Sequence, residues 1–240
     1  MNKSILLILM LIVQQALAQS TYYQDQARGE LKRFVIEEAE KSLHEQPITI
    51  TSYTSTRSAG GIHDFYSEGD YWWPDPMNPN GPYIQRDGET NPDNFVAHRK
   101  VMIRFSSIMG ALASAYILTG DEKYAQHAFE HARAWLIDTA SMMNPHMLFA
   151  QAIQGRVTGR GIGIIDMIQF MEVAQALIKL EQSTYARKQD YIGYRKWFST
   201  YLDWVSTHAY GIDEKNALNN HGTCWTLQVA SFARFTHDSS

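Results

Sequence analysis

Two asparagines and a histidine stand side by side in the segment ALNNHGTCW, residues 217–225. Asparagine favours the N-cap of a helix because its side-chain oxygen accepts a backbone N–H there, which accounts for one of the two. The other asparagine and His221 offer an amide donor and a group that exchanges protons near neutral pH. The pattern indicates acid–base chemistry, with a helix cap followed by a surface histidine as the alternative.

β-Elimination from a uronic acid polymer is a reaction that needs such groups. It removes the C5 proton and expels the 4-linked oxygen, and the C5 proton is weakly acidic because the neighbouring carboxylate is already negative. Donors that neutralise this carboxylate make the enolate-like intermediate accessible, and each charged hydrogen bond contributes roughly 1.5–3 kcal/mol. A histidine or tyrosine takes the proton, and a tyrosine or histidine returns one to the leaving oxygen.

A segment rich in aromatic and acidic residues, 61–88, has the composition of a sugar-binding loop. The rings of Tyr71, Trp72 and Trp73 could lie against sugar faces, while Asp, Asn and Arg side chains bind hydroxyls. The same segment holds possible metal ligands: His63, Asp64, Glu68, Asp70 and Asp75. Their spacing fits no metal motif, so we predict no metal, and nothing indicates another cofactor.

A third polar segment, residues 142–167, carries two glutamines and two arginines at the entry of a predicted helix: Gln151, Gln154, Arg156 and Arg160. Arginine binds carboxylates through two parallel hydrogen bonds, and the glycines around Arg160 allow a ligand to approach the backbone closely. A surface turn with ordinary basic residues is the alternative. The GRGIG run lacks the strand context and spacing of a dinucleotide-binding motif.

Helical periodicity dominates the elements that must position these residues. Apolar residues recur three or four apart in residues 22–43, 95–119, 123–138, 162–180 and 191–207, and a shorter helix is expected over 223–235. Short turns alternate with long polar loops at 46–94 and 139–161, with 48–51 as a possible extended piece. This order predicts an all-α fold, an (α/α) toroid of antiparallel helical hairpins, with an irregular bundle as the alternative.

The N-terminus has the pattern of a signal peptide. Lys3 supplies a positive charge, residues 5–13 are apolar but too short to span a bilayer, and Ala16 and Ala18 form a small-x-small cleavage site. We predict cleavage after Ala18, no membrane anchor, and export of residues 19–240 to the periplasm or the medium. An uncleaved anchor or a buried helix is the alternative.

Composition limits the partners of the chain. Its 240 residues have a formal net charge of −4, which argues against nucleic acid as the ligand. A polyanionic substrate stays possible, because the local field in a cleft can oppose the net charge. The single cysteine, Cys224, cannot form a disulfide within the chain, and its position near a helix start favours a packing role over a nucleophile.

Taken together, the segments resemble the alginate lyase superfamily, polysaccharide lyases with an (α/α) toroid fold. The resemblance rests on HDFYSEGDYWWPDP, GPYIQRDGETNPDNF, FAQAIQGRVTGRGIGIID and NNHGTCW, in matching order over residues 53–235. It implies β-eliminative cleavage of alginate or another polyuronate. It also implies that Asn220 neutralises the substrate carboxylate and that His221 takes part in proton abstraction or charge neutralisation.

The resemblance extends to residues that bind the acidic polysaccharide. It implies that Gln151 and Arg160 line the cleft and that Trp72 and Trp73 belong to a cleft loop. We also predict that Asn219, Tyr71, Trp72 and Trp73 contact the substrate. Family members also have a catalytic tyrosine and an arginine in later helical hairpins, and no match to either is found before Ser240. We therefore expect residues 19–240 to be the N-terminal part of a longer domain, with a shortened relative of weak or no lyase activity as the alternative.

Two other functions fit parts of the sequence. A non-catalytic glycan-binding protein would keep Trp72, Trp73 and Arg160 without needing His221. An (α/α) glycoside hydrolase would need two carboxylates on either side of the scissile bond, and Asp64 and Asp70 are among the candidates.

Overall fold

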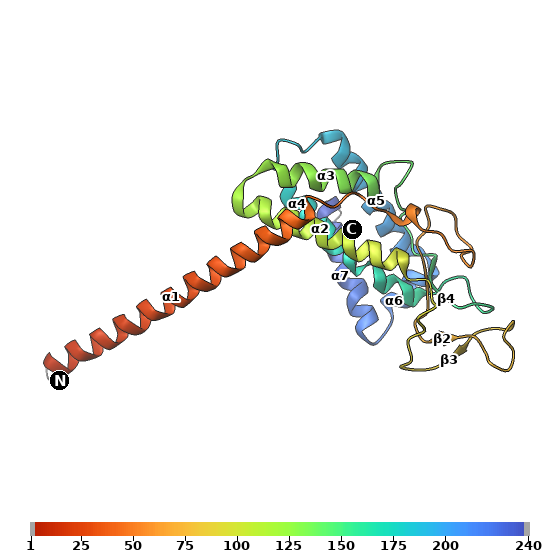
Figure 1. The fold of residues 1–240 in the computed structure, drawn as a ribbon, viewed down its shortest axis with the longest axis horizontal. Coiled ribbons are helices and arrows are strands. Elements are labelled where there is room, and N and C mark those ends of the chain that lie inside the picture. The colour runs from red at the N-terminus through yellow and green to blue at the C-terminus, as the bar shows by residue number, and fades with distance from the viewer. Residues whose placement is uncertain (1–2, 238–240) are drawn as a thin grey trace.

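The computed structural model describes residues 3–237, with side chains from Tyr22 onward. These residues form seven α-helices: α1 (Lys3–Ser42), α2 (Ala97–Thr119), α3 (Glu122–Leu136), α4 (Phe170–Leu180), α5 (Lys188–Thr207), α6 (Ala209–Lys215) and α7 (Asn220–Thr236). The helices pack as a toroid-like body from which the long loops emerge at one end (Figure 1). The all-α prediction is confirmed.

A tight turn joins α2 to α3. Gly120 ends α2 in the left-handed conformation, with φ 69°, and its N–H donates to the carbonyl of Tyr116. Glycine suits this position because it has no Cβ to clash. The side chain of Asp121 then caps α3 by accepting the Lys123 N–H at 3.0 Å. The helical hairpin predicted around this Thr-Gly-Asp turn is therefore confirmed.

Aromatic rings form the centre of the core. The ring of Phe170, at the start of α4, lies 5.6 Å from the ring of Phe105, 5.9 Å from that of Trp135 and 5.3 Å from that of Trp197. These residues come from α2, α3 and α5, and all are buried. Such rings add large apolar burial and favourable edge-to-face contacts. The aromatic cluster thus packs α2, α3, α4 and α5 against one another.

Two helical segments are long and apolar enough to cross a membrane by length and composition alone. They are α2 and Gly161–Leu180, which includes α4. Met102, Phe105 and Met109 of α2 are fully buried, and α2 packs against α1, α3 and α4. The hydropathy of α2 is therefore explained by its place in the core.

The long loops contain two small sheets that the sequence patterns did not predict. Strand β1 (Tyr66–Glu68) pairs in parallel with β4 (Phe149–Ala152), and β2 (Trp72–Trp73) pairs antiparallel with β3 (Ile84–Gln85). Strands this short show no measurable alternation of apolar and polar residues. The β1–β4 pair joins the two polar loops, which lie far apart in the sequence.

One further local prediction was wrong, and one helix was missed. The stretch expected to be extended at 48–51 instead leads into a 3-10 turn, η1 (Ile50–Ser52), because the Thr49 hydroxyl caps it by accepting the Thr51 N–H at 3.3 Å. No helix was predicted between residues 207 and 223, but this segment contains α6. The side chain of His208 caps that helix by accepting the Tyr210 N–H at 3.1 Å.

Helix α1 projects from the body as a single long rod (Figure 1). Phe34 and Leu31 are largely exposed on it, whereas Ala39 near its end is buried in the core. The predicted signal peptide, residues 1–18, lies outside the residues whose side chains are described, and its first two residues lie outside the described chain altogether. Its backbone from Lys3 belongs to α1. Cleavage after Ala18 stays a prediction.

Candidate functional site

Most of the predicted site residues line one hollow of about 330 Å³ at the loop end of the body. Its walls come from the turn before β2, from β3 and β4, from the 3-10 segment η2 (Gly161–Gln169) and from the first turn of α7. The lining residues are Asp70, Tyr71, Trp72, Gln85, Gln151, Arg160, Ile162, Ile165 and His221. The structure thus gathers side chains from three sequence segments that were singled out separately.

His221 stands in the first turn of α7, and two neighbours fix its position. The side chain of Asn219 caps the helix by accepting the His221 N–H at 3.0 Å. The imidazole Nδ1 lies 2.6 Å from Oε1 of Glu214, a residue of α6 that is only 2% exposed. A carboxylate at this distance favours the tautomer with the proton on Nδ1, which leaves the lone pair of Nε2 available as a base.

Glu214 is a functional candidate that the sequence analysis missed. Burial raises the pKa of its carboxyl group, and the hydrogen bond from His221 opposes this rise. The carboxylate is thus stabilised chiefly by the imidazole that it orients. No sequence motif marks this pair, because the glutamate lies in a short helix whose position relative to His221 depends on the turn between α6 and α7.

Arg160 is held at the hollow by Gln151. Its Nε donates to the Gln151 carbonyl at 2.9 Å, and its Nη2 donates to the Gln151 side-chain oxygen at 3.2 Å. Gln151 adopts φ 50°, a left-handed conformation that is unusual for any residue except glycine. Its N–H donates to the hydroxyl of Ser67 at 2.9 Å. A strained backbone that supports an arginine is typical of functional sites.

The guanidinium of Arg160 has no carboxylate within ion-pair distance among the described residues. Burial lowers its pKa, and the charge of Asp70 opposes this shift. The guanidinium carbon lies 6.0 Å from the ring centre of Trp72. A Cβ at Gly69 would stand 2.7 Å from Cδ1 of Trp72 and 2.8 Å from Nη2 of Arg160, so a larger residue there would displace these side chains. A partly buried cation without a carboxylate partner is suited to an anionic ligand.

A partly buried ion-pair network holds Asp70, one of the residues that line the hollow. Arg99 Nη1 donates to both carboxylate oxygens of Asp70, at 2.9 and 3.1 Å, and its Nε donates to Asp166 at 3.3 Å. Ser67 also donates to Asp166, at 3.2 Å. Burial raises the pKa of Asp166, and Arg99 opposes the shift. This network links Asp70 at the hollow to the hydroxyl that holds the backbone of Gln151.

Three predicted residues do not line the hollow. Trp73 follows Trp72 in β2, and successive side chains of a strand point to opposite faces. Trp73 instead donates from Nε1 to the Glu89 carbonyl at 2.8 Å and stacks under Arg86. Asn219 and Asn220 are exposed, and Asn219 acts as the helix cap. Asn220 adjoins the lining residue His221. Substrate binding by these residues stays a prediction.

The possible metal ligands have other partners. Asp64 accepts hydrogen bonds from Asn144 at 2.7 Å and pairs with His146 at 3.2 Å, while Glu68 pairs with Arg57 at 2.6 Å. In the part of the chain that is described, no group of three His, Cys, Asp or Glu side chains is arranged as a metal site. These carboxylates neutralise neighbouring donors within the loops.

A larger groove of about 640 Å³ lies elsewhere, between α1, α2 and α4. Phe34, Gly110, Ala111 and Met171 are among its lining residues, and none of the predicted site residues is. Its lining has two carboxylates, Glu38 and Glu172, but no histidine, lysine or arginine, so the smaller hollow around His221 is the better candidate for chemistry.

The protein-family model described as 'Alginate lyase' matches residues 49–240 of the chain. The chain belongs to the alginate lyase family. A crystal structure of an alginate lyase from Bacteroides ovatus is similar to it, with a TM-score of 0.79 and 34% identical residues. The similar region covers 86% of this chain and 55% of that one, so the chain spans about half the length of that alginate lyase. The comparison with curated proteins gave no match.

Proposed function

We propose that this alginate lyase family member is a polysaccharide lyase that cleaves alginate or a related polyuronate by β-elimination. One observation carries the proposal. The imidazole of His221, held by the buried carboxylate of Glu214, lines the same hollow as Arg160 and Gln151. A base and a cation are thus placed together, where a uronate would present its C5 proton beside its carboxylate.

Arg160 neutralises the uronate carboxylate in this mechanism. Its Nε and Nη2 are held by Gln151, and Nη1 makes no hydrogen bond within the described chain. Asn220, exposed beside His221, supplies an amide donor from the rim of the hollow. Tyr71 and Trp72 line the hollow with aromatic surface for the sugar rings. These donors stabilise the charge that moves onto the carboxylate when C5 loses its proton.

His221 then takes the C5 proton on Nε2. The electron pair of the C5–H bond forms the C4–C5 double bond, and the C4–O bond breaks with its electrons on the leaving oxygen. Glu214 stabilises the imidazolium that results, as an orienting carboxylate does for a general base. In members of the family that the chain resembles, a tyrosine from later helical hairpins returns a proton to the leaving oxygen.

The hydrolase alternative finds less support in the hollow. Hydrolysis of a glycosidic bond needs two carboxyl groups that face each other across it. Asp70 is the one carboxylate among the lining residues, and Arg99 engages both of its oxygens. Asp64 and Glu68 lie away from the hollow and are paired with His146 and Arg57.

We also propose that the protein is exported and works in the periplasm or outside the cell. The positive charge, the short apolar stretch and the small residues before position 19 support this location. A large acidic polysaccharide would be met there.

The first experiment follows the ultraviolet absorbance of the conjugated unsaturated uronate, which elimination produces and hydrolysis does not. Wild-type protein should raise this absorbance with alginate or glucuronan and not with a neutral polysaccharide. His221→Ala should lower the rate by about 10²–10⁴-fold, because the general base is lost. His44→Ala is the matched control, since His44 is exposed and remote from the hollow.

The possible outcomes separate the candidate functions. Equal rates for wild type and His221→Ala would remove His221 from the mechanism. Cleavage without the absorbance change would indicate a hydrolase. Binding of the polyuronate without any cleavage would support the glycan-binding function.

A further inference from the structure

A second hollow, of about 450 Å³, lies near the first and shares no lining residue with it. Two arginines, a glutamine and a tyrosine contribute side chains to it, namely Arg57, Gln154, Arg156 and Tyr210, and the backbone between β4 and η2 closes it. Neither the mechanism above nor the family resemblance uses this hollow. Its chemistry is set by the two guanidinium groups.

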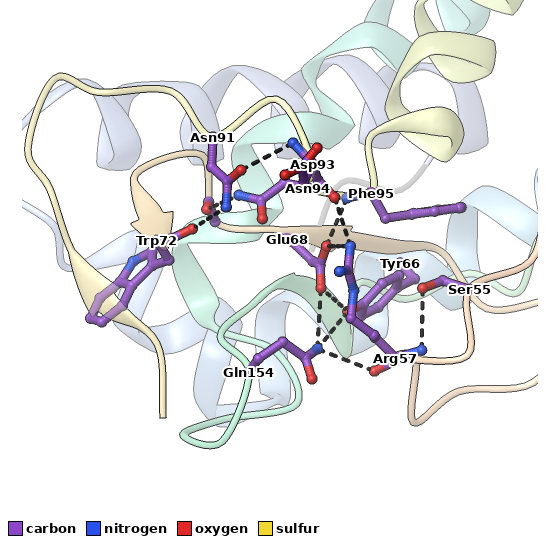
Figure 2. Close-up of polar contacts among 11 residues, drawn as sticks. Ser55, Arg57, Tyr66, Glu68, Trp72, Asn91, Asp93, Asn94, Phe95 and Gln154 are labelled. Atoms are coloured by element: carbon purple, nitrogen blue, oxygen red, sulfur yellow. Dashed lines mark hydrogen bonds and ion pairs between the residues drawn. The ribbon is translucent and has the colours of Figure 1, made fainter. Parts of the chain in front are cut away.

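Glu68 does not line this hollow, but it binds two residues that do, Arg57 and Gln154 (Figure 2). It is 2% exposed, and its Oε2 accepts from Arg57 at 2.6 Å and from the Phe95 N–H at 2.7 Å. Its Oε1 accepts from the Tyr66 hydroxyl at 2.9 Å and from the Gln154 amide at 3.1 Å. Four donors therefore satisfy the buried carboxylate, which fixes Arg57 and Gln154 against the hollow.

Arg57 keeps donors available for a ligand. Only its Nη2 is engaged, by Glu68 and by the Asp93 carbonyl, and no hydrogen bond within the described chain uses its Nε or Nη1. About a third of its side chain is exposed. The guanidinium is thus anchored at one nitrogen and open at the others.

Arg156 is held by two residues that do not line the hollow, Tyr83 and Trp72. Its Nε donates to the Tyr83 carbonyl at 2.6 Å, and its guanidinium carbon lies 5.3 Å from the ring centre of Trp72. No carboxylate of the described residues lies within ion-pair distance of it, and its side chain is exposed. An arginine fixed by a hydrogen bond and an aromatic ring, with both Nη groups unengaged, is prepared to bind a planar anion.

Trp72 connects this hollow to the one around His221. The same indole ring lies within cation–π distance of Arg156 and of Arg160. Strand β4 and the residues after it place Gln151 in one hollow and Gln154 in the other. A polymer that extends from the first hollow past Trp72 therefore meets the guanidinium groups of Arg57 and Arg156.

We propose that the hollow between Arg57 and Arg156 is a remote subsite that binds the carboxylate of a uronate unit away from the bond that is cleaved. The subsite rests on the proposed function, since a polyuronate carries a carboxylate on every unit. Arg156 is its main specificity-determining residue. Glu68 is a positioning residue, because it acts through Arg57 and Gln154.

The test measures binding in a background that does not turn over the ligand. His221→Ala protein is titrated calorimetrically with defined uronate oligomers and with carboxyl-reduced oligomers of the same length. Adding Arg156→Gln should weaken binding of the longer acidic oligomers roughly tenfold, the lower range for a charged hydrogen bond. The carboxyl-reduced oligomers should bind the two proteins equally. The affinity of the Arg156→Lys protein for the acidic oligomers should be intermediate, because lysine keeps the positive charge but cannot donate two parallel hydrogen bonds.

Arg187→Gln in the same background is the matched control, because Arg187 is exposed and lies outside both hollows. Equal affinities for the Arg156→Gln and Arg187→Gln proteins would overturn the subsite while leaving the lyase assay intact. A loss that is as large for carboxyl-reduced oligomers would overturn the carboxylate assignment. Absence of any acidic-oligomer binding would overturn the subsite, and the absorbance assay would decide the proposed function separately.

Discussion

The hydrogen bond between His221 and Glu214 is the single contact on which the proposed chemistry depends most. The buried carboxylate favours the imidazole tautomer with the proton on Nδ1, and in the proposed mechanism it stabilises the imidazolium that forms when the proton moves. Gln151 does the equivalent for Arg160, through two acceptors and a left-handed backbone. In both cases one side chain orients another to which the proposed mechanism gives a direct role.

Glu214→Gln should lower kcat by at least about 100-fold while changing KM little, because the glutamine keeps the shape but not the charge that fixes the tautomer. The melting temperature at neutral pH should not fall, since burial already raises the pKa of Glu214 and disfavours its ionised form. Steady-state kinetics and thermal unfolding check this. Glu214→Asp should recover part of the activity, and an unchanged kcat in Glu214→Gln would reduce the pair to a packing contact.

The sequence indicated both members of the pair Gln151–Arg160 but only one member of the pair His221–Glu214. His221 was visible because two asparagines precede it, and Arg160 because glycines surround it. Glu214 could not be predicted, because its role depends on how α6 meets α7. Arg99 and Asp166 were missed for the same reason, since they meet only in the folded chain.

Helix α3 shows how an element is attached to its neighbour by two histidines. The Nε2 atoms of His127 and His131 lie 2.9 and 3.0 Å from one carbonyl oxygen, that of Glu45, just after α1. His131 is fully buried, and burial lowers its pKa to about 4. Nearby Arg104 and His127 also disfavour its protonation. The histidine therefore holds α3 to the end of α1 in its neutral form.

Stability should fall in acid because of His131. Its pKa in the folded protein lies below the ordinary value of 6.5, so the unfolded chain binds more protons between about pH 6.5 and about pH 4. The free energy of unfolding should rise with pH across this range, by at most about 3 kcal/mol. Urea unfolding of wild type and His131→Gln between these pH values measures the slope.

The glutamine variant keeps an N–H donor for the Glu45 carbonyl and does not titrate, so its slope should be smaller. His44→Gln, at an exposed site, should behave as wild type. Parallel pH curves for wild type and His131→Gln would contradict the assignment.

Periodicity predicted the long helices well and the short elements poorly. The segments expected at 95–119 and 191–207 correspond to α2 and α5 with small shifts of their ends. Helix α6 and strands β1 to β4 span so few residues that no apolar repeat can develop in them. Their formation depends on tertiary contacts and on capping side chains.

Across the whole molecule, α1 is the element that stands apart. The predicted cleavage after Ala18 falls inside this continuous helix and would leave residues 19–42 attached to the body. Protein expressed with its N-terminus intact in a secreting host should be recovered outside the cytoplasm and begin at Gln19, as measured by intact mass and N-terminal sequencing. Ala18→Arg should block processing, because the cleavage site needs a small residue there. Recovery of the wild-type protein with its N-terminus uncleaved would contradict the signal peptide and favour an uncleaved anchor or a buried helix.

The parallel pairing of β1 with β4 has a consequence for the order in which the protein folds. It joins Tyr66 to Phe149, across the whole of the α2–α3 hairpin, whereas that hairpin closes through the tight turn at Gly120. Closing the longer loop costs more chain entropy and is slower. We expect the helical body to form first and the two hollows last, so that a partly refolded population regains its helical circular dichroism before it regains affinity for polyuronate.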